Sequence, residues 1–385
     1  MTSPMRLPIT SNRSRGLWSA ALVAGLGTIV CCTAHAESRS YAIEWFSLAS
    51  YSQDGDCPAG LNPPTREQYV TSLELLGKTP EEARQMMDVF PRPGLDGEAV
   101  RQALRMRGRI DGKPVNGYIY PWAVADPKLH SVEGKFALGF DLDGKAEPAS
   151  FEDPMTHEKG VDNQLFRALG CIEQFRGTYE YRPTFWDFIW GSMKVTTPAW
   201  LFTVSGESLD RDGPVTITFD RALEHLSFGP AGTATADMTY RIDPDPRSHH
   251  EFRGQIRNGV LTVADTGNLV LLLDTLAFTE LRLEQFHLRL NPKPNGHLEG
   301  LIGGYQPLKD VYFGIALSGM AGEGMIINDT PGIYYLLKRN ADGAPDAASG
   351  EHAAISAAYH IDAVPVFAIA PKGSTESRAL ASRSP

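Results

Sequence analysis

A run of alternating apolar and polar residues between Pro214 and Tyr305 constrains the fold of this chain more than any other feature. Val215, Ile217 and Phe219 alternate with polar neighbours, and the same two-residue period recurs further along. Successive side chains of a β-strand point to opposite faces, so this pattern indicates strands with one apolar and one polar face. Roughly seven such strands predict an antiparallel sheet, arranged as a sandwich or a curved barrel-like meander.

Turn signals and one change of phase divide this β-region. Asn258-Gly259 is a dipeptide that tight hairpin turns favour, and Asn295-Gly296 marks another turn. The apolar positions shift by one residue near Glu284-Gln285, which predicts a β-bulge. Because the connections are short, we expect consecutive strands to pair.

Helical patterns are common before this region. Helices are predicted from capping signals at Thr65, Thr79, Asp96 and Asp162, each followed by apolar residues three or four positions apart. Tyr41–Ser50 is rich in aromatic and β-favouring residues and predicts an opening strand. We therefore predict an α+β fold, with a helical and loop-rich N-terminal part followed by an antiparallel β-sheet domain.

Changes in composition and periodicity predict five segments. The C-terminal extension combines a helix at Pro331–Arg339 with a last strand pair near Ala354–Ile369, and the tail after it is rich in Ser and Ala. The predicted segments are a signal peptide (1–36), a helical and loop-rich domain (37–205), an antiparallel β-domain (206–305), a mixed C-terminal extension packing on the β-domain (306–371) and a disordered tail (372–385).

Residues 1–36 follow the three-part pattern of a secretory signal peptide. Three arginines precede the uncharged, mostly apolar run Leu17–Val30, and Ala34-His35-Ala36 places small residues before the expected cleavage point. The run is about 14 residues long, short of the roughly 20 that a membrane-spanning helix needs. Acylation at Cys31 or Cys32 is an alternative. We expect a periplasmic or extracellular protein with no integral membrane span after cleavage.

Export changes both the charge and the cysteine count. Without the three arginines, the 36 basic residues fall to 33 against 46 acidic ones, a formal charge of −13. Such an acidic protein lacks the basic surface that a general nucleic-acid binder needs. Cys57 and Cys171 remain, and in an oxidising compartment they are expected to form one disulfide. A loop of about 100 residues closed in this way is worth roughly 4–5 kcal/mol in the chain-entropy model.

The segment Phe140–Gln164 concentrates acidic residues and is the main candidate for a site. It contains the Asp-x-Asp-Gly pattern common in calcium loops, where alternating oxygen ligands wrap a hard cation. It departs from an EF-hand at Gly139 and Ser150. The alternatives are a plain turn at Asp143-Gly144 and a helix N-cap at Asp162. For a non-EF-hand Ca²⁺ site we predict these ligands: Asp141, Asp143, Asp153 and Asp162.

Two weaker metal-binding patterns occur elsewhere. The acidic loop Asn340–Asp346 resembles part of a calcium loop, but Lys338 occupies the first ligand position and a solvated turn is expected. Several histidines lie in or beside the β-region without the spacing of a known metal motif, so we expect them at the solvent-facing side. They are His225, His249, His250, His287 and His297.

No catalytic signature accompanies these patterns. The sequence has neither a Gly-x-Ser-x-Gly elbow nor a phosphate-binding P-loop. The main hypothesis is an exported, non-enzymatic binding or envelope-associated protein that calcium stabilises. The alternatives are a secreted hydrolase that uses carboxylates of residues 141–162 and a periplasmic protein that binds a lipid or another apolar ligand.

Overall fold

The structure is a computed structural model that describes residues 36–89, 95–178, 180–273, 280–317, 329–345 and 347–371. The predicted tail and all but the last residue of the predicted signal peptide lie outside the described residues. Among the described residues, no helix is long and apolar enough to cross a membrane.

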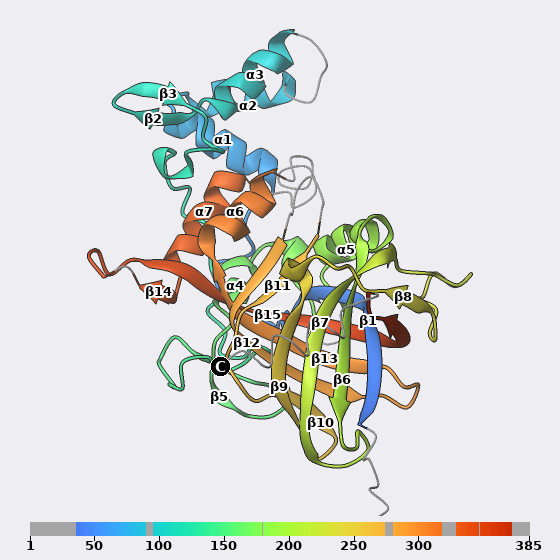
Figure 1. The fold of residues 1–385 in the computed structure, drawn as a ribbon. Helices are drawn as coiled ribbons and strands as arrows, with labels where there is room; N and C mark the ends of the chain where they lie inside the picture. Colours follow the sequence, from blue (N-terminus) through green and yellow to red (C-terminus); the bar gives the residue numbers. More distant parts are fainter. Residues whose placement is uncertain are drawn as a thin grey trace, which may run out of the picture. The chain divides into compact units, whose positions relative to one another are not determined.

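Eight antiparallel strands form a closed barrel (Figure 1). The sheet closes because β1 pairs with β6 on one side and with β15 on the other. Of the two arrangements predicted from the sequence, a sandwich and a curved barrel-like meander, the structure has the barrel. In spatial order its strands are β1 (Glu37–Leu48), β6 (Pro198–Gly206), β7 (Gly213–His225), β9 (His250–Arg257), β10 (Val260–Val263), β12 (Glu280–Pro292), β13 (Leu298–Pro307) and β15 (His352–Ile369).

The predicted turns and bulge of the β-region are confirmed. Asn258 and Gly259, with φ of 52° and 76°, connect the hairpin β9–β10. The register of β12 against β13 shifts between Glu284 and His287, and Gln285 has a φ of 51°. Consecutive strands pair from β6 to β13 apart from short β8 and β11, as short connections require. By contrast, the predicted strand pair near Ala354–Ile369 is wrong, because these residues belong to the single 18-residue strand β15.

The barrel interior is packed with apolar side chains. Phe202, Phe219, Phe286 and Ile302 are fully buried in one large cluster with residues of β1 and β15. Helix α5 (Thr184–Thr196) packs against β1, and Phe185 and Trp190 of this helix belong to the core together with Trp200 of β6.

Further helices and short strands lie between and after the barrel strands. The helices agree with the predicted α+β class, whereas the five-segment division stays a prediction. The helices are α1 (Thr65–Leu75), α2 (Pro80–Val89), α3 (Leu95–Arg105), α4 (Gln164–Leu169), α6 (Leu308–Leu317) and α7 (Thr330–Arg339). Short strands are β2 (Gly108–Ile110), β3 (Lys113–Val115), β4 (Phe151–Glu152), β5 (Lys159–Val161), β8 (Thr239–Arg241), β11 (Leu269–Leu272) and β14 (Gly343–Pro345).

Three of the four predicted helix starts are corrected and one is confirmed. Helix α3 begins at Leu95, so Asp96 lies inside the helix and not at its N-cap. Helix α1 begins at Thr65 itself, and Pro64 occupies the N-cap position with no side-chain hydrogen bond. Helix α4 is capped by Asn163 rather than by Asp162. At α2, Thr79 and Glu82 form the expected reciprocal capping box, each side chain accepting the other's backbone N–H.

Residues 138–142 cover the outer face of the barrel. Leu138, Phe140 and Leu142 are buried in one cluster with Leu301 of β13 and Ala358 of β15. These two strand residues alternate with residues that point into the barrel, so the covering segment lies on the outside. This contact positions the acidic segment beside the end of β14–β15.

The predicted disulfide is confirmed. Cys57 and Cys171 are bonded, with their Cα atoms 5.8 Å apart. The bond joins the loop after β1 to the residues directly after α4, and its sulfurs pack among buried residues that include Val132 and Phe166.

Candidate functional site

Three of the four predicted calcium ligands come together. One carboxylate oxygen from each of Asp141, Asp143 and Asp162 lies within 4.8 Å of the other two. Asp162 is only 7% exposed, whereas Asp143 is at the surface, so the cluster extends from the protein interior to solvent.

Local backbone hydrogen bonds fix each carboxylate. Asp141 Oδ1 accepts the Gly144 N–H at 2.7 Å, and Asp143 Oδ1 accepts the Lys145 N–H at 2.8 Å. The predicted turn at Asp143-Gly144 is therefore present, with Gly144 at a φ of 74°. These bonds use one oxygen of each side chain. The second oxygen of Asp143 pairs with Lys145 Nζ at 3.3 Å at the surface, so a cation bound there would displace this lysine.

Asp162 joins the cluster because it does not cap a helix. The Asn163 side chain accepts the Phe166 N–H and so caps α4. The Asp162 N–H donates to the Phe140 carbonyl at 2.7 Å, and Asp162 Oδ2 accepts the Leu142 N–H at 2.9 Å. Both bonds hold Asp162 beside the Asp-x-Asp turn.

The fourth predicted ligand, Asp153, has a different environment. Its Oδ1 accepts the backbone N–H groups of Met155 and Thr156, and its Oδ2 pairs with Arg289 at 2.8 Å. Arg289 also pairs with Glu158 at 3.2 Å. Asp153 is completely buried and its charge is already balanced, so it lies outside the cluster of three aspartates.

A further aspartate comes from the second acidic loop. Asp342 lines the same cavity of about 190 Å³ as Asp143 and Asp162. Its Oδ1 accepts the Ser356 N–H at 2.7 Å, which ties it to β15. In the sequence, residues 340–346 form a separate loop with a weak calcium pattern. In the fold, Asp342 of this loop lies beside the main acidic segment.

The electrostatics of the cavity are unfavourable to so many negative charges. Burial raises the pKa of Asp162 to about 7, although the hydrogen bond from the Leu142 N–H opposes this rise. Burial also raises the pKa of Asp342. Three neighbouring carboxylates add to the rise at Asp162: Asp143, Asp342 and Asp141.

Two arginines line the cavity but are engaged elsewhere. Arg167 donates to the carbonyls of Val132 and Ala149, and Arg339 pairs with Asp126 at 2.9 Å. The cluster therefore offers hard oxygen ligands to a divalent cation. A buried carboxyl group with a pKa near 7 is also what general-acid catalysis needs.

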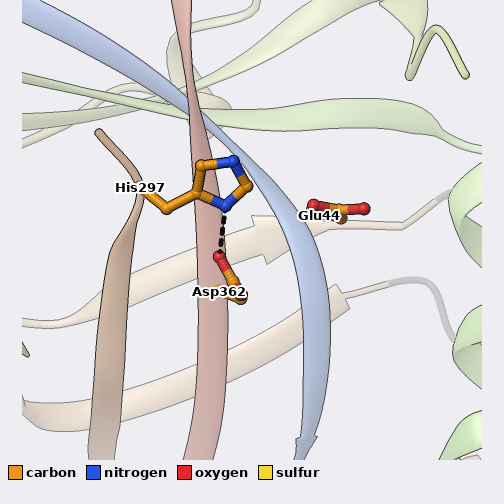
Figure 2. A group of neighbouring side chains, drawn as sticks. All are labelled: Glu44, His297 and Asp362. Atoms are coloured by element: carbon orange, nitrogen blue, oxygen red, sulfur yellow. Dashed lines mark hydrogen bonds and ion pairs between the residues drawn. The ribbon is translucent and has the colours of Figure 1, made fainter. Parts of the chain in front are cut away.

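A second group of metal-ligand residues lies on another part of the barrel surface (Figure 2). Glu44, His297 and Asp362 each offer one ligand atom within 4.8 Å of the others. Sequence reasoning expected His297 at the solvent-facing side, but its side chain is 19% exposed and pairs with Asp362 at 3.0 Å. No sequence signal links these three positions, which come from segments far apart in the chain.

Comparison with known proteins identifies no relative, since no family model, curated protein or solved structure matches this chain.

Proposed function

We propose that this chain is an exported, non-enzymatic binding protein whose fold is stabilised by Ca²⁺ at Asp141, Asp143 and Asp162. The observation that carries the proposal is the approach of three carboxylate oxygens to within 4.8 Å of one another. Like charges at this separation repel strongly in a partly buried site, and a divalent cation removes that repulsion.

Two further observations support the proposal. Asp342 lines the same cavity, so a cation there would link the acidic segment to the loop beside β15. The Cys57–Cys171 disulfide agrees with an oxidising compartment outside the cytosol. Extracellular calcium modules function with dissociation constants of about 10⁻⁴–10⁻³ M, which a site with few ligands can reach.

The test compares melting temperatures in Ca²⁺ and in excess EGTA. We expect Ca²⁺ to raise the melting temperature of the wild-type protein and to leave that of Asp143→Asn unchanged, because a cluster ligand is lost. Asp153→Asn is the matched control. It should melt at a lower temperature in both buffers and keep the full calcium shift, because Asp153 pairs with Arg289 instead.

Two results would contradict this proposal. A wild-type melting temperature independent of Ca²⁺ is the first, and a normal calcium shift in Asp143→Asn is the second. A stable Asp143→Asn protein that lacks a hydrolytic activity of the wild type would support the hydrolase hypothesis instead.

An aromatic cleft supports apolar-ligand binding as a second candidate function. The cleft has a volume of about 560 Å³, within the range of roughly 300–1,000 Å³ typical of small-molecule sites. By comparison, the cavity at Phe46, Trp186 and Tyr359 measures only about 60 Å³. The cleft is lined by Tyr120, Trp122, Tyr312, Phe313 and Tyr334.

The charges at the cleft favour a ligand with an anionic group. Lys309, Lys338 and His352 line it against a single acid, Glu351, which pairs with Lys338. This excess of basic groups contrasts with a chain of formal charge −10. A long-chain carboxylate combines an apolar body with an anionic group and suits this lining.

Tryptophan fluorescence during titration with oleate tests this candidate. Trp122 is 55% exposed, so a bound ligand should shift its emission to shorter wavelength. We expect Trp122→Ala and Lys309→Ala to weaken binding about tenfold, and Tyr181→Ala, an exposed aromatic residue that does not line the cleft, to have no effect. Equal binding by all of these proteins would exclude the cleft as the site.

A further inference from the structure

We propose that Glu44, His297 and Asp362 form a site for a divalent transition metal such as zinc, separate from the calcium cluster (Figure 2). The chemistry of the ligands selects this class of metal. Zinc binds imidazole nitrogen and carboxylate oxygen together, whereas calcium takes oxygen ligands alone. A single histidine with two carboxylates therefore favours a borderline transition metal over Ca²⁺ or Mg²⁺.

Barrel closure brings the three residues together. Glu44 belongs to β1, Asp362 to β15, and His297 directly precedes β13. Strand β15 pairs with β1 on one side and with β13 on the other. Figure 2 shows the Asp362 side chain directly below the His297 ring, joined to it by the dashed line, with Glu44 to the right. Because paired strands hold all three segments, the site needs no large rearrangement to accept an ion.

The distance between His297 and Asp362 suits two ligands of a tetrahedral ion. Ligand atoms about 2.0–2.1 Å from a tetrahedral zinc are roughly 3.3 Å from one another. His297 Nδ1 and Asp362 Oδ1 are already 3.0 Å apart. The side chains of His297 and Asp362 are 19% and 18% exposed, which leaves solvent access for a fourth ligand such as water.

A β-bulge gives Glu44 its place in the group. In the pairing of β1 with β15, Ile43 lies opposite Ala363 and Trp45 lies opposite Asp362, so Glu44 is the extra residue. Bulges redirect side chains and are common beside functional sites. Glu44 Oε1 accepts the Ala234 N–H at 2.8 Å, which orients the carboxylate and leaves Oε2 available to an ion.

The charged neighbours on this face are mostly engaged with other partners. Glu299, opposite Asp362 on β13, pairs with His360 at 3.0 Å and also with Lys293. Arg182 is the nearby cation, and its guanidinium lies over the Trp45 ring, 3.9 Å from the centroid. Within the described ranges, no ion pair joins Arg182 to the proposed ligands, but its positive charge acts on Asp362 and Glu44 from a longer distance and partly offsets their repulsion.

Titration of EDTA-treated, dialysed protein with Zn²⁺ in a calorimeter tests the proposal. We expect one zinc ion per chain, with binding at least tenfold weaker in His297→Ala and in Glu44→Gln. Binding of Co²⁺ in place of zinc should give the visible absorption of a tetrahedral site, which an ordinary His–Asp ion pair cannot produce. Circular dichroism melting verifies that the variants are folded.

Two control variants separate this site from others. His249 pairs with Asp220 at 2.8 Å, but no third potential ligand joins them among the residues described, so His249→Ala should bind zinc normally. Asp143→Asn should also bind zinc normally, whether or not the calcium proposal holds. The proposal is overturned if no zinc binds at 100-fold molar excess, if His297→Ala binds as well as wild type, or if Asp143→Asn abolishes binding.

Discussion

Removal of the Asp162 charge should stabilise the calcium-free protein at alkaline pH. Asp162 is 7% exposed and lies beside Asp141 and Asp143, so its ionised form is disfavoured by burial and by repulsion. The substitution Asp162→Asn keeps the shape of the side chain. Its amide oxygen can still accept the Leu142 N–H, so the change isolates the effect of the charge.

The pKa of Asp162 gives the size and the sign of the change in folding stability with pH. The value is about 7 in the folded protein and 3.8 for an ordinary aspartate, a difference of about three units. Since the folded value is the higher one, the folded protein holds a proton that the unfolded chain has lost between pH 4 and pH 7. Stability therefore falls as the pH rises through this window, by about 4 kcal/mol in total at 1.36 kcal/mol per unit.

Thermal unfolding in EGTA at pH 5 and at pH 8 measures this cost. Residues 36–385 form one unit of about 350 residues, for which 4 kcal/mol corresponds to roughly 5 °C in melting temperature. The melting temperature of Asp162→Asn should be higher than that of the wild type by about this amount at pH 8, and by less at pH 5. Saturating Ca²⁺ should raise the melting temperature of the wild type at pH 8 and leave that of the variant unchanged.

The sign of the difference in melting temperature between Asp162→Asn and the wild type decides whether this reasoning holds. If Asp162→Asn melts below wild type at pH 8 in EGTA, the Asp162 charge stabilises the calcium-free fold and the reasoning fails. A difference that is the same at pH 5 and pH 8 would show that Asp162 does not titrate in this window. Asp153→Asn provides the contrast, because loss of its ion pair with Arg289 should destabilise the protein at both pH values.

Three further variants test the packing of the fold by urea denaturation. Arg107→Ala should cost about 3–5 kcal/mol, because Arg107 and Asp329 form an ion pair in which both side chains are 1% exposed. Replacement of both Cys57 and Cys171 by alanine should cost roughly 4–5 kcal/mol, and a loss below 1 kcal/mol would contradict the loop-entropy argument. Phe286→Ala should cost about 3–5 kcal/mol, because this fully buried ring contacts two other phenylalanines in the barrel interior.

Features that depend on neighbouring residues were predictable from the sequence. Asn258-Gly259 forms its turn because few other residues tolerate the positive φ values of 52° and 76°. The capping box of Thr79 and Glu82 needs only residues three positions apart. The pairing of Cys57 with Cys171 follows from counting, because these are the only two cysteines outside the predicted signal peptide.

Features that depend on distant segments were not predictable in the same way. Asp153 resembles the other acids of its segment in sequence, but its partner Arg289 is 136 residues away. Nothing local to Asp162 shows that Asn163 caps α4 instead. Strand β15 is covered on its outer face as well as its inner face, so its sequence has no alternation of polar and apolar residues. The sequence pattern therefore could not show that it is a single strand of the barrel.

Barrel closure explains why the proposed zinc site draws its ligands from distant parts of the chain, whereas the proposed calcium ligands come from one segment. Pairing of β1 with β15 joins Glu44 to Asp362, and the segment packed outside β13 and β15 carries Asp141 and Asp162. A ligand set of this kind does not exist in the unfolded chain, so metal binding at either site would add to the folding free energy. At a metal concentration 100 times the dissociation constant, the gain is about 2.7 kcal/mol per site. If the two sites are independent, the melting shifts caused by Ca²⁺ and Zn²⁺ should add, and each should vanish with its own ligand variant alone.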